Sequence, residues 1–168
     1  MNLDPRSFDP RAFGAAVASP DDAEQVLAED CARAMWQRDA ASRALGMRLD
    51  EVGPGRAVMT MRVRPDMLNG VGTCHGGILF ALADSCFGFA CNSRNRTAVA
   101  AGCSIDYLAP AREGDLLRAE AAECASAGRN GVYDVRISDE AGTTLAVFRG
   151  RCREVGTAVL DAPPAPSR

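Results

Sequence analysis

The sequence predicts a single α+β domain in which a strongly curved antiparallel β-sheet wraps around one long central helix. Three observations lead to this prediction. Residues 78–92 carry apolar or small side chains on every side of a helical projection, which is typical of a helix buried all round. Two strand patterns precede this segment, and four consecutive strand patterns with short links follow it. Antiparallel strands can keep one face in water, so a bent sheet of them can enclose such a helix.

The region before the central helix contains one helical pattern and two strand patterns. Residues 21–39 begin with acidic side chains and have an apolar side, which predicts a helix. A short strand is expected at 45–49. In 57–63 the odd positions are Ala, Met, Met and Val, and Thr and Arg face the other way, which indicates a half-buried strand. A loop with glycines, 66–73, then leads to the central helix.

Four strands are expected after the central helix. The first alternates apolar side chains with small or polar ones and stops at Pro110, and Asn130-Gly131 between the second and third is a hairpin signal. A small wrapped sheet leaves edge strands exposed, and a second copy commonly covers them, so a dimer is expected. The four predicted strands are 99–107, 115–125, 132–138 and 143–153.

The chain length of 168 residues suits one domain. Residues 1–20 are rich in Pro, Asp and Arg without periodicity, and we expect them to form a flexible leader. The folded domain is expected to cover 21–155. Residues 156–168 contain several prolines and are expected to be a flexible tail.

The composition argues against several classes of function. A net charge of −3 provides no broad positive field, so nucleic acid is not an expected partner. Seven cysteines without a C-x-x-C pair argue against a disulfide framework and against a metal site, and they fit a reducing cytoplasm. The N-terminus has no signal-peptide pattern, and the apolar stretch 76–92 is short for a membrane span. A cytoplasmic protein without a membrane role is expected.

A segment with several glycines leads into the central helix and suggests a binding site at the helix N-terminus. It reads Asn69-Gly-Val-Gly-Thr-Cys-His75-Gly76-Gly77. The first N–H groups of a helix have no partner within the helix, and the helix dipole adds positive character there. Glycines at 76 and 77 leave these donors open, which suits a carbonyl oxygen that gains negative charge in a tetrahedral intermediate. Glycines at a helix start can also serve packing alone.

Asp84 is the strongest catalytic candidate, because it is the only charged residue between His75 and Arg94. Burying a carboxylate without partners costs on the order of several kcal/mol, so its presence in an apolar helix calls for a reason. Small residues one helical turn away leave space beside it. Catalysis is favoured over the alternative, in which Asp84 bonds a backbone group or a subunit partner for specificity alone.

His75 is the only histidine, and it either orients a reacting group or satisfies a loop carbonyl. Cys74 beside it suggests a cysteine hydrolase. Adjacent side chains of an extended segment point in opposite directions, however, so the pair would not form a nucleophile–base contact. We reject that interpretation.

The residues Asn69-G-x-G-x-x-His75-Gly76-Gly77, Asp84 within L-A-D-S, and the later runs A-V-A-A-G-C-S-I-D-Y-L-A-P and G-R-N-G-V-Y-D-V form a specific combination. Together they resemble the PaaI-type phenylacetate-degradation thioesterases of the hotdog-fold superfamily, over about 25–155. The resemblance implies an acyl-coenzyme A (acyl-CoA) thioesterase whose acyl group is aromatic, such as a hydroxylated phenylacetyl. It implies no cofactor and no metal, since coenzyme A is part of the substrate.

The resemblance also implies a homotetramer, built as a dimer of dimers with active sites at the dimer interface. Asp84 of one subunit would act as general base or as nucleophile, and the Gly76 N–H of the other would polarise the thioester carbonyl. Asn69 would hold the water or the carboxylate, and His75 would orient the carbonyl or the loop. The residues expected to bind the substrate are Gly77, Tyr107, Gly128, Arg129 and Asn130. Some relatives carry a serine where this chain has Ala100, a departure that bears on any hydroxyl-assisted step.

Two other functions stay open from the sequence. A hotdog-fold hydratase or dehydratase of acyl-CoA would pair a carboxylate with a histidine, and His75 with Asp84 could form that pair. A non-catalytic acyl-CoA sensor would bind the substrate and release no thiol. The combination of Asn69, Gly76 and Asp84 favours the hydrolase over both.

Overall fold

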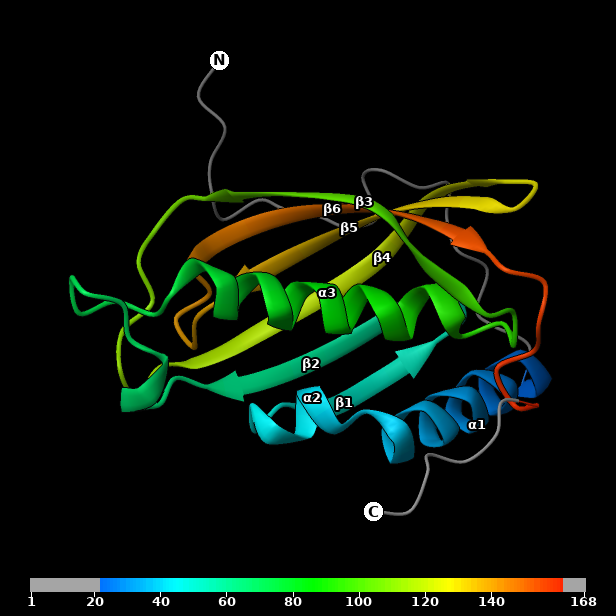
Figure 1. The fold of residues 1–168 in the computed structure, drawn as a ribbon, viewed down its shortest axis with the longest axis horizontal. Helices are drawn as coiled ribbons and strands as arrows, with labels where there is room; N and C mark the ends of the chain where they lie inside the picture. The colour runs from blue at the N-terminus through cyan, green and yellow to red at the C-terminus, as the bar shows by residue number, and fades with distance from the viewer. Residues whose placement is uncertain (1–21, 162–168) are drawn as a thin grey trace.

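The computed structural model describes residues 22–161 and shows one six-stranded antiparallel sheet curved around a central helix (Figure 1). The strand order is β1-β2-β4-β5-β6-β3, and every neighbouring pair is antiparallel. The predicted architecture is therefore confirmed. The elements are α1 (Asp22–Arg38), α2 (Ala40–Ala44), β1 (Arg48–Gly53), β2 (Arg56–Arg62), the 3₁₀ turn η2 (Pro65–Met67), α3 (Gly76–Asn92), β3 (Ala98–Tyr107), β4 (Leu116–Ala127), β5 (Asn130–Ser138) and β6 (Thr144–Glu154).

The strand predicted at 45–49 begins too early, because α2 ends at Ala44, a turn at 45–46 follows it, and β1 starts at Arg48. Asp39 caps α2 by accepting a 3.0 Å hydrogen bond from the Ser42 N–H, as short polar side chains at helix starts commonly do. Gly46, at φ +73°, then turns the chain out of the helix in a conformation that favours glycine. The first strand therefore begins at Arg48.

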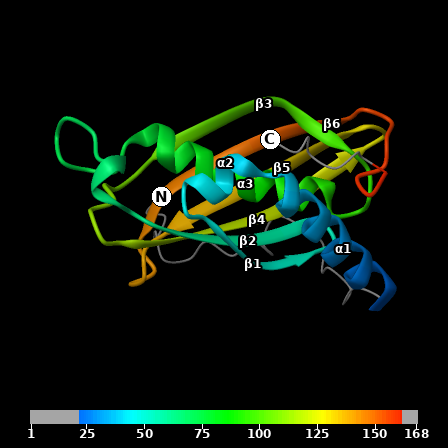
Figure 2. The same ribbon diagram turned by 60° about the horizontal axis from the view of Figure 1, so that its bottom comes forward.

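The central helix α3 is packed between the sheet and the two N-terminal helices (Figure 2). Phe87 and Phe89 are almost fully buried, and the Phe89 ring packs at a tilt against Trp36 of α1 with a centroid distance of 5.9 Å. Ser85 hydrogen-bonds Ser42 of α2 at 2.8 Å. Aromatic burial on both sides of α3 thus fixes its position over the concave face of the sheet.

The prediction that α3 is buried all round is wrong for a single copy of the chain. One stripe of the helix is half-buried or exposed, and it lies toward β3, since Cys103 of β3 contacts Asp84. β3 is an edge strand, and only Ala98 among its residues is buried. The sheet ends at β3, and nothing in the described part of the chain, 22–161, covers this side. The stripe is formed by Gly77, Ala81, Asp84, Gly88 and Cys91.

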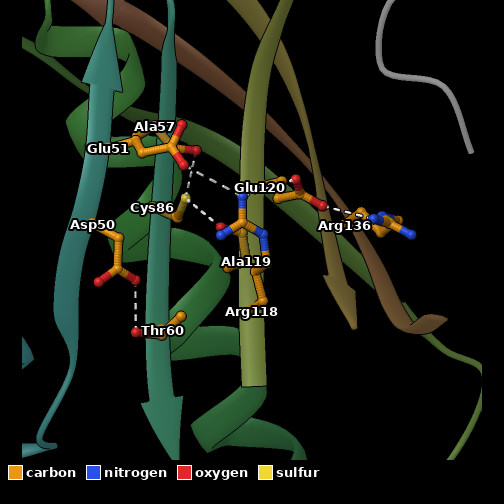
Figure 3. Close-up of polar contacts among 9 residues, drawn as sticks. All are labelled: Asp50, Glu51, Ala57, Thr60, Cys86, Arg118, Ala119, Glu120 and Arg136. Carbon is orange, nitrogen blue, oxygen red and sulfur yellow. Dashed lines mark hydrogen bonds and ion pairs between the residues drawn. The ribbon is translucent and has the colours of Figure 1, made fainter. Parts of the chain in front are cut away.

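The two faces of the sheet differ in chemistry, as the alternation in the sequence predicts (Figure 3). On the concave side the Cys86 thiol of α3 donates to the carbonyl oxygens of Ala57 and Ala119, at 3.3 and 3.4 Å. On the other side Glu120 of β4 pairs with Arg136 of β5 at 2.7 Å. The helix is therefore hydrogen-bonded to the sheet centre, while ion pairs line the outer face.

The packed part of the chain extends beyond residue 155, the predicted C-terminal boundary of the domain. Val159 is buried, its carbonyl accepts a 3.1 Å hydrogen bond from Arg38, and the Leu160 N–H donates to Asn95. The predicted leader, 1–20, and the rest of the predicted tail, 162–168, lie outside the described residues. Within 22–161, no helix is long and apolar enough to cross a membrane.

Candidate functional site

Asn69 organises the loop that leads into α3. Its Oδ1 accepts hydrogen bonds from the Val71 and Thr73 N–H groups, at 3.0 and 3.2 Å, and its Nδ2 donates to Thr73 Oγ1 at 2.9 Å. Such side chain-to-backbone bonds replace the regular pairing that a tight loop lacks. The Asn69 amide is thus engaged within its own loop in a single chain, and it sets the loop's shape.

His75 is the N-cap of α3. Its Nδ1 accepts a 2.9 Å hydrogen bond from the Gly77 N–H, and its carbonyl accepts from the Ile78 N–H at 2.8 Å. In this arrangement Nδ1 carries no proton, so a neutral ring carries its proton on Nε2. His75 therefore occupies the Gly77 N–H, one of the N–H groups at the helix start that have no acceptor within the helix.

The Gly76 N–H is left open by this capping. Within 22–161 it has no hydrogen-bond acceptor, whereas the Gly77 N–H is bound to His75. The helix dipole points its positive end at this amide. Of the two glycines that the sequence offers as donors, Gly76 is the one available to a ligand oxygen.

Tyr107, at the end of β3, lies against the start of α3. Its hydroxyl donates a 2.9 Å hydrogen bond to the Gly76 carbonyl, and a Cβ on Gly76 would come within 3.0 Å of its ring. Tyr107 is 51% exposed, so one side of the ring remains open to a ligand. The structure thus brings together Asn69, His75, Gly76, Gly77 and Tyr107 at the N-terminal end of α3.

Asp84 lies half-buried near the middle of α3 and faces β3. The Cys103 Sγ is 3.9 Å from its Oδ1, and within the described part of the chain Asp84 forms no ion pair. Burial raises the pKa of Asp84, and the hydrogen bond from Cys103 lowers it in part. Burial also raises the pKa of the Cys103 thiol, with a further increase from the charge of Asp84. An unpaired carboxylate of raised pKa is suited to accept a proton or to attack a carbonyl.

Sequence reasoning did not single out Cys103. It lies in the alternating pattern of the predicted strand 99–107, which shows only that it shares a face with its apolar neighbours. The contact with Asp84 depends on how β3 packs beside α3, and no local signal in the sequence reports that packing.

Gly128, Arg129 and Asn130 lie at the β4–β5 turn, beside the opposite end of α3 from Gly76 (Figure 1). Both Nε and Nη2 of Arg129 donate to the Glu154 carbonyl, at 3.0 and 2.7 Å. The turn borders a cavity of about 260 Å³, which Cys91 at the C-terminal end of α3 also lines. A single chain therefore separates the predicted site residues into two groups, with Asp84 between them.

Gly76 and Asp84 are also too far apart to act on one carbonyl from the same chain. They are separated by about two helical turns, or roughly 12 Å along the axis. A group that attacks a carbonyl carbon and a donor to its oxygen must each lie within about 3–3.5 Å of that carbonyl. A site that uses both residues needs them from two copies of the chain.

Groups that bind metals do not gather in this region. Among residues 22–161, no cluster of three or more His, Cys, Asp or Glu side chains is arranged to hold a metal ion. The chemistry available at the site is that of a carboxylate, a thiol, an imidazole, a carboxamide, a helix N-terminus and a tyrosine hydroxyl.

The comparisons with known proteins agree with this set of groups. The model of a protein family described as "Thioesterase superfamily" matches residues 71–146. Acyl-coenzyme A thioesterase PaaI of Escherichia coli is 45% identical over 125 residues, which are 74% of this chain and 89% of that protein.

Solved structures show the same similarity. The structure of the E. coli PaaI protein from the phenylacetic acid degradation operon matches with a TM-score of 0.79 and 42% identity, over 80% of this chain and 97% of that one. A hypothetical thioesterase of Streptococcus pneumoniae, solved with coenzyme A, matches with a TM-score of 0.64 and 26% identity, over 66% of this chain and 90% of that one.

Proposed function

This chain belongs to the thioesterase superfamily and is an acyl-CoA thioesterase, and we propose that Asp84 carries out its chemistry on a thioester bound across two subunits. The observation that carries the proposal is the half-buried Asp84 carboxylate, whose pKa is raised by burial and which has no ion-pair partner among residues 22–161. A carboxylate kept in this state is unfavourable for folding and useful for catalysis.

The proposed reaction divides the work between Asp84 and Gly76. Asp84 either takes a proton from the attacking water or attacks the thioester carbon itself, forming a mixed anhydride that water then opens. The Gly76 N–H of the other subunit donates to the carbonyl oxygen as negative charge develops on it. The products are the free acid and the coenzyme A thiol.

The exposed side of the molecule supports a site shared by two copies. Val99 and Tyr107 of β3 are each 51% exposed and Leu108, directly after the strand, is 59% exposed, next to the uncovered stripe of α3. An edge strand with such side chains is a suitable surface for pairing. An antiparallel pairing of β3 with its copy would bring the Gly76 end of one helix toward Asp84 of the other. We propose this dimer, and a tetramer built from two of them, as the active form.

Asn69 and His75 are proposed to position the donor. The Asn69 amide holds the loop, and the His75 ring caps Gly77, so that the Gly76 N–H alone stays open. Gly77 leaves room for the cap, since a Cβ there would lie 3.1 Å from His75 Nδ1. This role differs from the direct contact with water that the resemblance implies for Asn69.

The coenzyme A part of the substrate is proposed to extend from Tyr107 toward the turn at 128–130 of a neighbouring subunit. Arg129 uses Nε and Nη2 for the Glu154 carbonyl, and its exposed guanidinium keeps N–H groups for a phosphate. Asn130 and Gly128 form the turn that presents it. The acyl group is proposed to be aromatic, of the hydroxylated phenylacetyl type, on the strength of the similarity to PaaI.

A panel of acyl-CoA substrates tests this function. The purified protein is given hydroxyphenylacetyl-, phenylacetyl- and straight-chain acyl-CoA, and the free thiol is measured. We expect thiol release, fastest with the aromatic substrates. Equal rates on straight-chain substrates would remove the aromatic preference. An enoyl-CoA in the same panel tests for a hydratase, which would consume the enoyl absorbance without releasing thiol, and tight binding without any turnover would indicate a sensor.

A further inference from the structure

Gly88 is a glycine inside α3 that the packing of the described chain does not require. A Cβ added there would meet no atom within 4 Å beyond the backbone of its own helix. At Gly76 and Gly77, by contrast, a Cβ would lie 3.0 Å from Tyr107 and 3.1 Å from His75. Glycine is less favourable than alanine in a helix interior, because its backbone loses more freedom on folding. The fold therefore carries an unfavourable residue at this position without a contact that explains it.

The backbone at Gly88 is held in place, so the glycine is not needed as a hinge. The Gly88 carbonyl accepts a 2.9 Å hydrogen bond from Asn92 Nδ2, and the same amide donates to the Ala98 carbonyl at 3.1 Å. Asn92 Oδ1 also accepts from the Ala98 N–H at 2.9 Å. These bonds tie the end of α3 to the start of β3. What glycine supplies here is the absence of a side chain, since its conformational freedom is not used.

The space left open by Gly88 lies next to Asp84. The two residues are four positions apart, so they share one face of the helix at a separation of about 6 Å along its axis. β3 runs back along α3 from Ala98, at the end of the helix, to Cys103, which contacts Asp84. The strand residues that pass Gly88 are therefore 99–102, and three of these four are Ala or Gly. Helix and strand both keep their side chains small beside the carboxylate.

The direction in which the substrate is bound decides what occupies this space, and this step rests on the proposed function. A thioester carbonyl at Asp84 has a coenzyme A arm and an acyl arm. The coenzyme A arm is proposed to leave toward Tyr107, which contacts Gly76 at the N-terminal end of α3. The acyl arm then leaves toward the other end of the helix, where Gly88 comes one turn after Asp84. A phenylacetyl group is longer than one helical turn of ~5.4 Å, so its ring would pass over Gly88.

We propose that Gly88 determines which acyl groups the enzyme accepts, by leaving room for an aromatic ring beside Asp84. A side chain at this position would take the volume of the ring and leave the coenzyme A arm untouched. In an apolar pocket a change of one methylene alters selectivity by roughly 10- to 200-fold, so added volume should act strongly. Asp84 carries out the chemistry, and Gly88 selects the acyl group by size.

The variants Gly88→Ala and Gly88→Leu test the proposal with two ligands. One ligand is the phenacyl thioether of coenzyme A, which carries a ring and has no thioester to hydrolyse, and the other is free coenzyme A. Calorimetry measures both dissociation constants. In Gly88→Leu the Kd of the thioether should rise at least ~10-fold, and in Gly88→Ala it should rise less. The Kd of free coenzyme A should stay within about twofold of wild type in both.

Two further measurements show that the variants are folded. Alanine removes the cost of glycine in the helix, so the melting temperature of Gly88→Ala should rise by roughly 2–4 °C. Gln37→Leu is the control, because it adds the same side chain on an exposed position of α1, and it should bind both ligands as the wild type does.

Three results would overturn the proposal: equal weakening of both ligands in Gly88→Leu, unchanged binding of the thioether, or loss of the dimer in size-exclusion chromatography. The last result would mean that a second copy fills the space. A wild-type protein that releases no thiol from acyl-CoA would contradict the proposed function itself, and this outcome is read before any Gly88 variant is compared.

Discussion

The Tyr107 hydroxyl donates a hydrogen bond of 2.9 Å to the Gly76 carbonyl and so connects the end of β3 to the first turn of α3. Its ring occupies the space beside Gly76, because a Cβ on that residue would come within 3.0 Å of the ring. The Gly76 N–H, on the same residue, has no acceptor within 22–161. The contact therefore fixes the peptide groups around the donor that we propose for the thioester carbonyl.

Removing this hydroxyl should weaken catalysis without unfolding the protein. In Tyr107→Phe one hydrogen bond is lost at a half-exposed position, which corresponds to a decrease in kcat/KM of roughly 3- to 10-fold. Steady-state thiol release measures the effect. Tyr133→Phe is the matched control, because its hydroxyl bonds Glu123 far from Gly76, and its activity should stay within twofold of wild type. Equal losses in both variants would show that the Tyr107 contact has no special role.

Asp84→Asn should reduce thioester turnover by at least ~100-fold, the scale typical of losing a general base or nucleophile. The amide keeps the size of the side chain, so folding should persist and can be checked by circular dichroism. Asp30→Asn, at an exposed position of α1 paired with Arg33, serves as the control and should retain full activity. Turnover within a few-fold of wild type in Asp84→Asn would refute the assignment.

Asp84→Asn should also be more stable than the wild type at neutral pH. Burial raises the folded-state pKa of Asp84, so the charged form destabilises the fold, and stability is lost as the pH rises from the unfolded pKa through the folded one. Asn removes this charge, and the melting temperature should increase by roughly 2–5 °C at pH 7. At acid pH, where Asp84 is protonated, the difference should disappear. Thermal melts from pH 3 to 8 measure it, and a difference independent of pH would contradict the explanation.

In Cys103→Val, the acid limb of the pH profile of kcat should move to higher pH. The thiol hydrogen bond stabilises the Asp84 carboxylate and lowers its pKa in part, so its loss raises that pKa further. A bond of this kind corresponds to a shift between about 0.3 and 1 pH unit. The pH profile of thiol release gives the midpoint. Cys124→Val is the control, and a shift to lower pH in Cys103→Val would show that the thiol acts in another way.

Arg129→Gln should raise KM for acyl-CoA by roughly 3- to 10-fold and leave kcat nearly unchanged, because the guanidinium is proposed to contact a phosphate and not the reacting carbon. The same variant should reduce the dependence of KM on salt. Arg33→Gln, on the exposed side of α1, is the control. A fall in kcat with unchanged KM would move Arg129 out of the proposed binding role.

Local patterns in the sequence were sufficient for much of the fold. The strand 57–63 is predicted from alternation and the helix 78–92 from an apolar run on every face, and the structure places β2 at Arg56–Arg62 and α3 at Gly76–Asn92. The strand predicted at 45–49 starts before β1, because the cap at Asp39 and the turn at Gly46 each involve too few residues to appear in the periodicity.

The sequence by itself determined that one helix is apolar on every side, that it carries a single carboxylate, and that glycines precede it, since charge, size and periodicity are properties of neighbouring residues. Only the tertiary structure decided that the Tyr107 hydroxyl bonds the Gly76 carbonyl and that Cys103 contacts Asp84. These contacts depend on the register of β3 and β6 and on their packing against α3. Register and packing join segments that are far apart along the chain, so no local pattern encodes them.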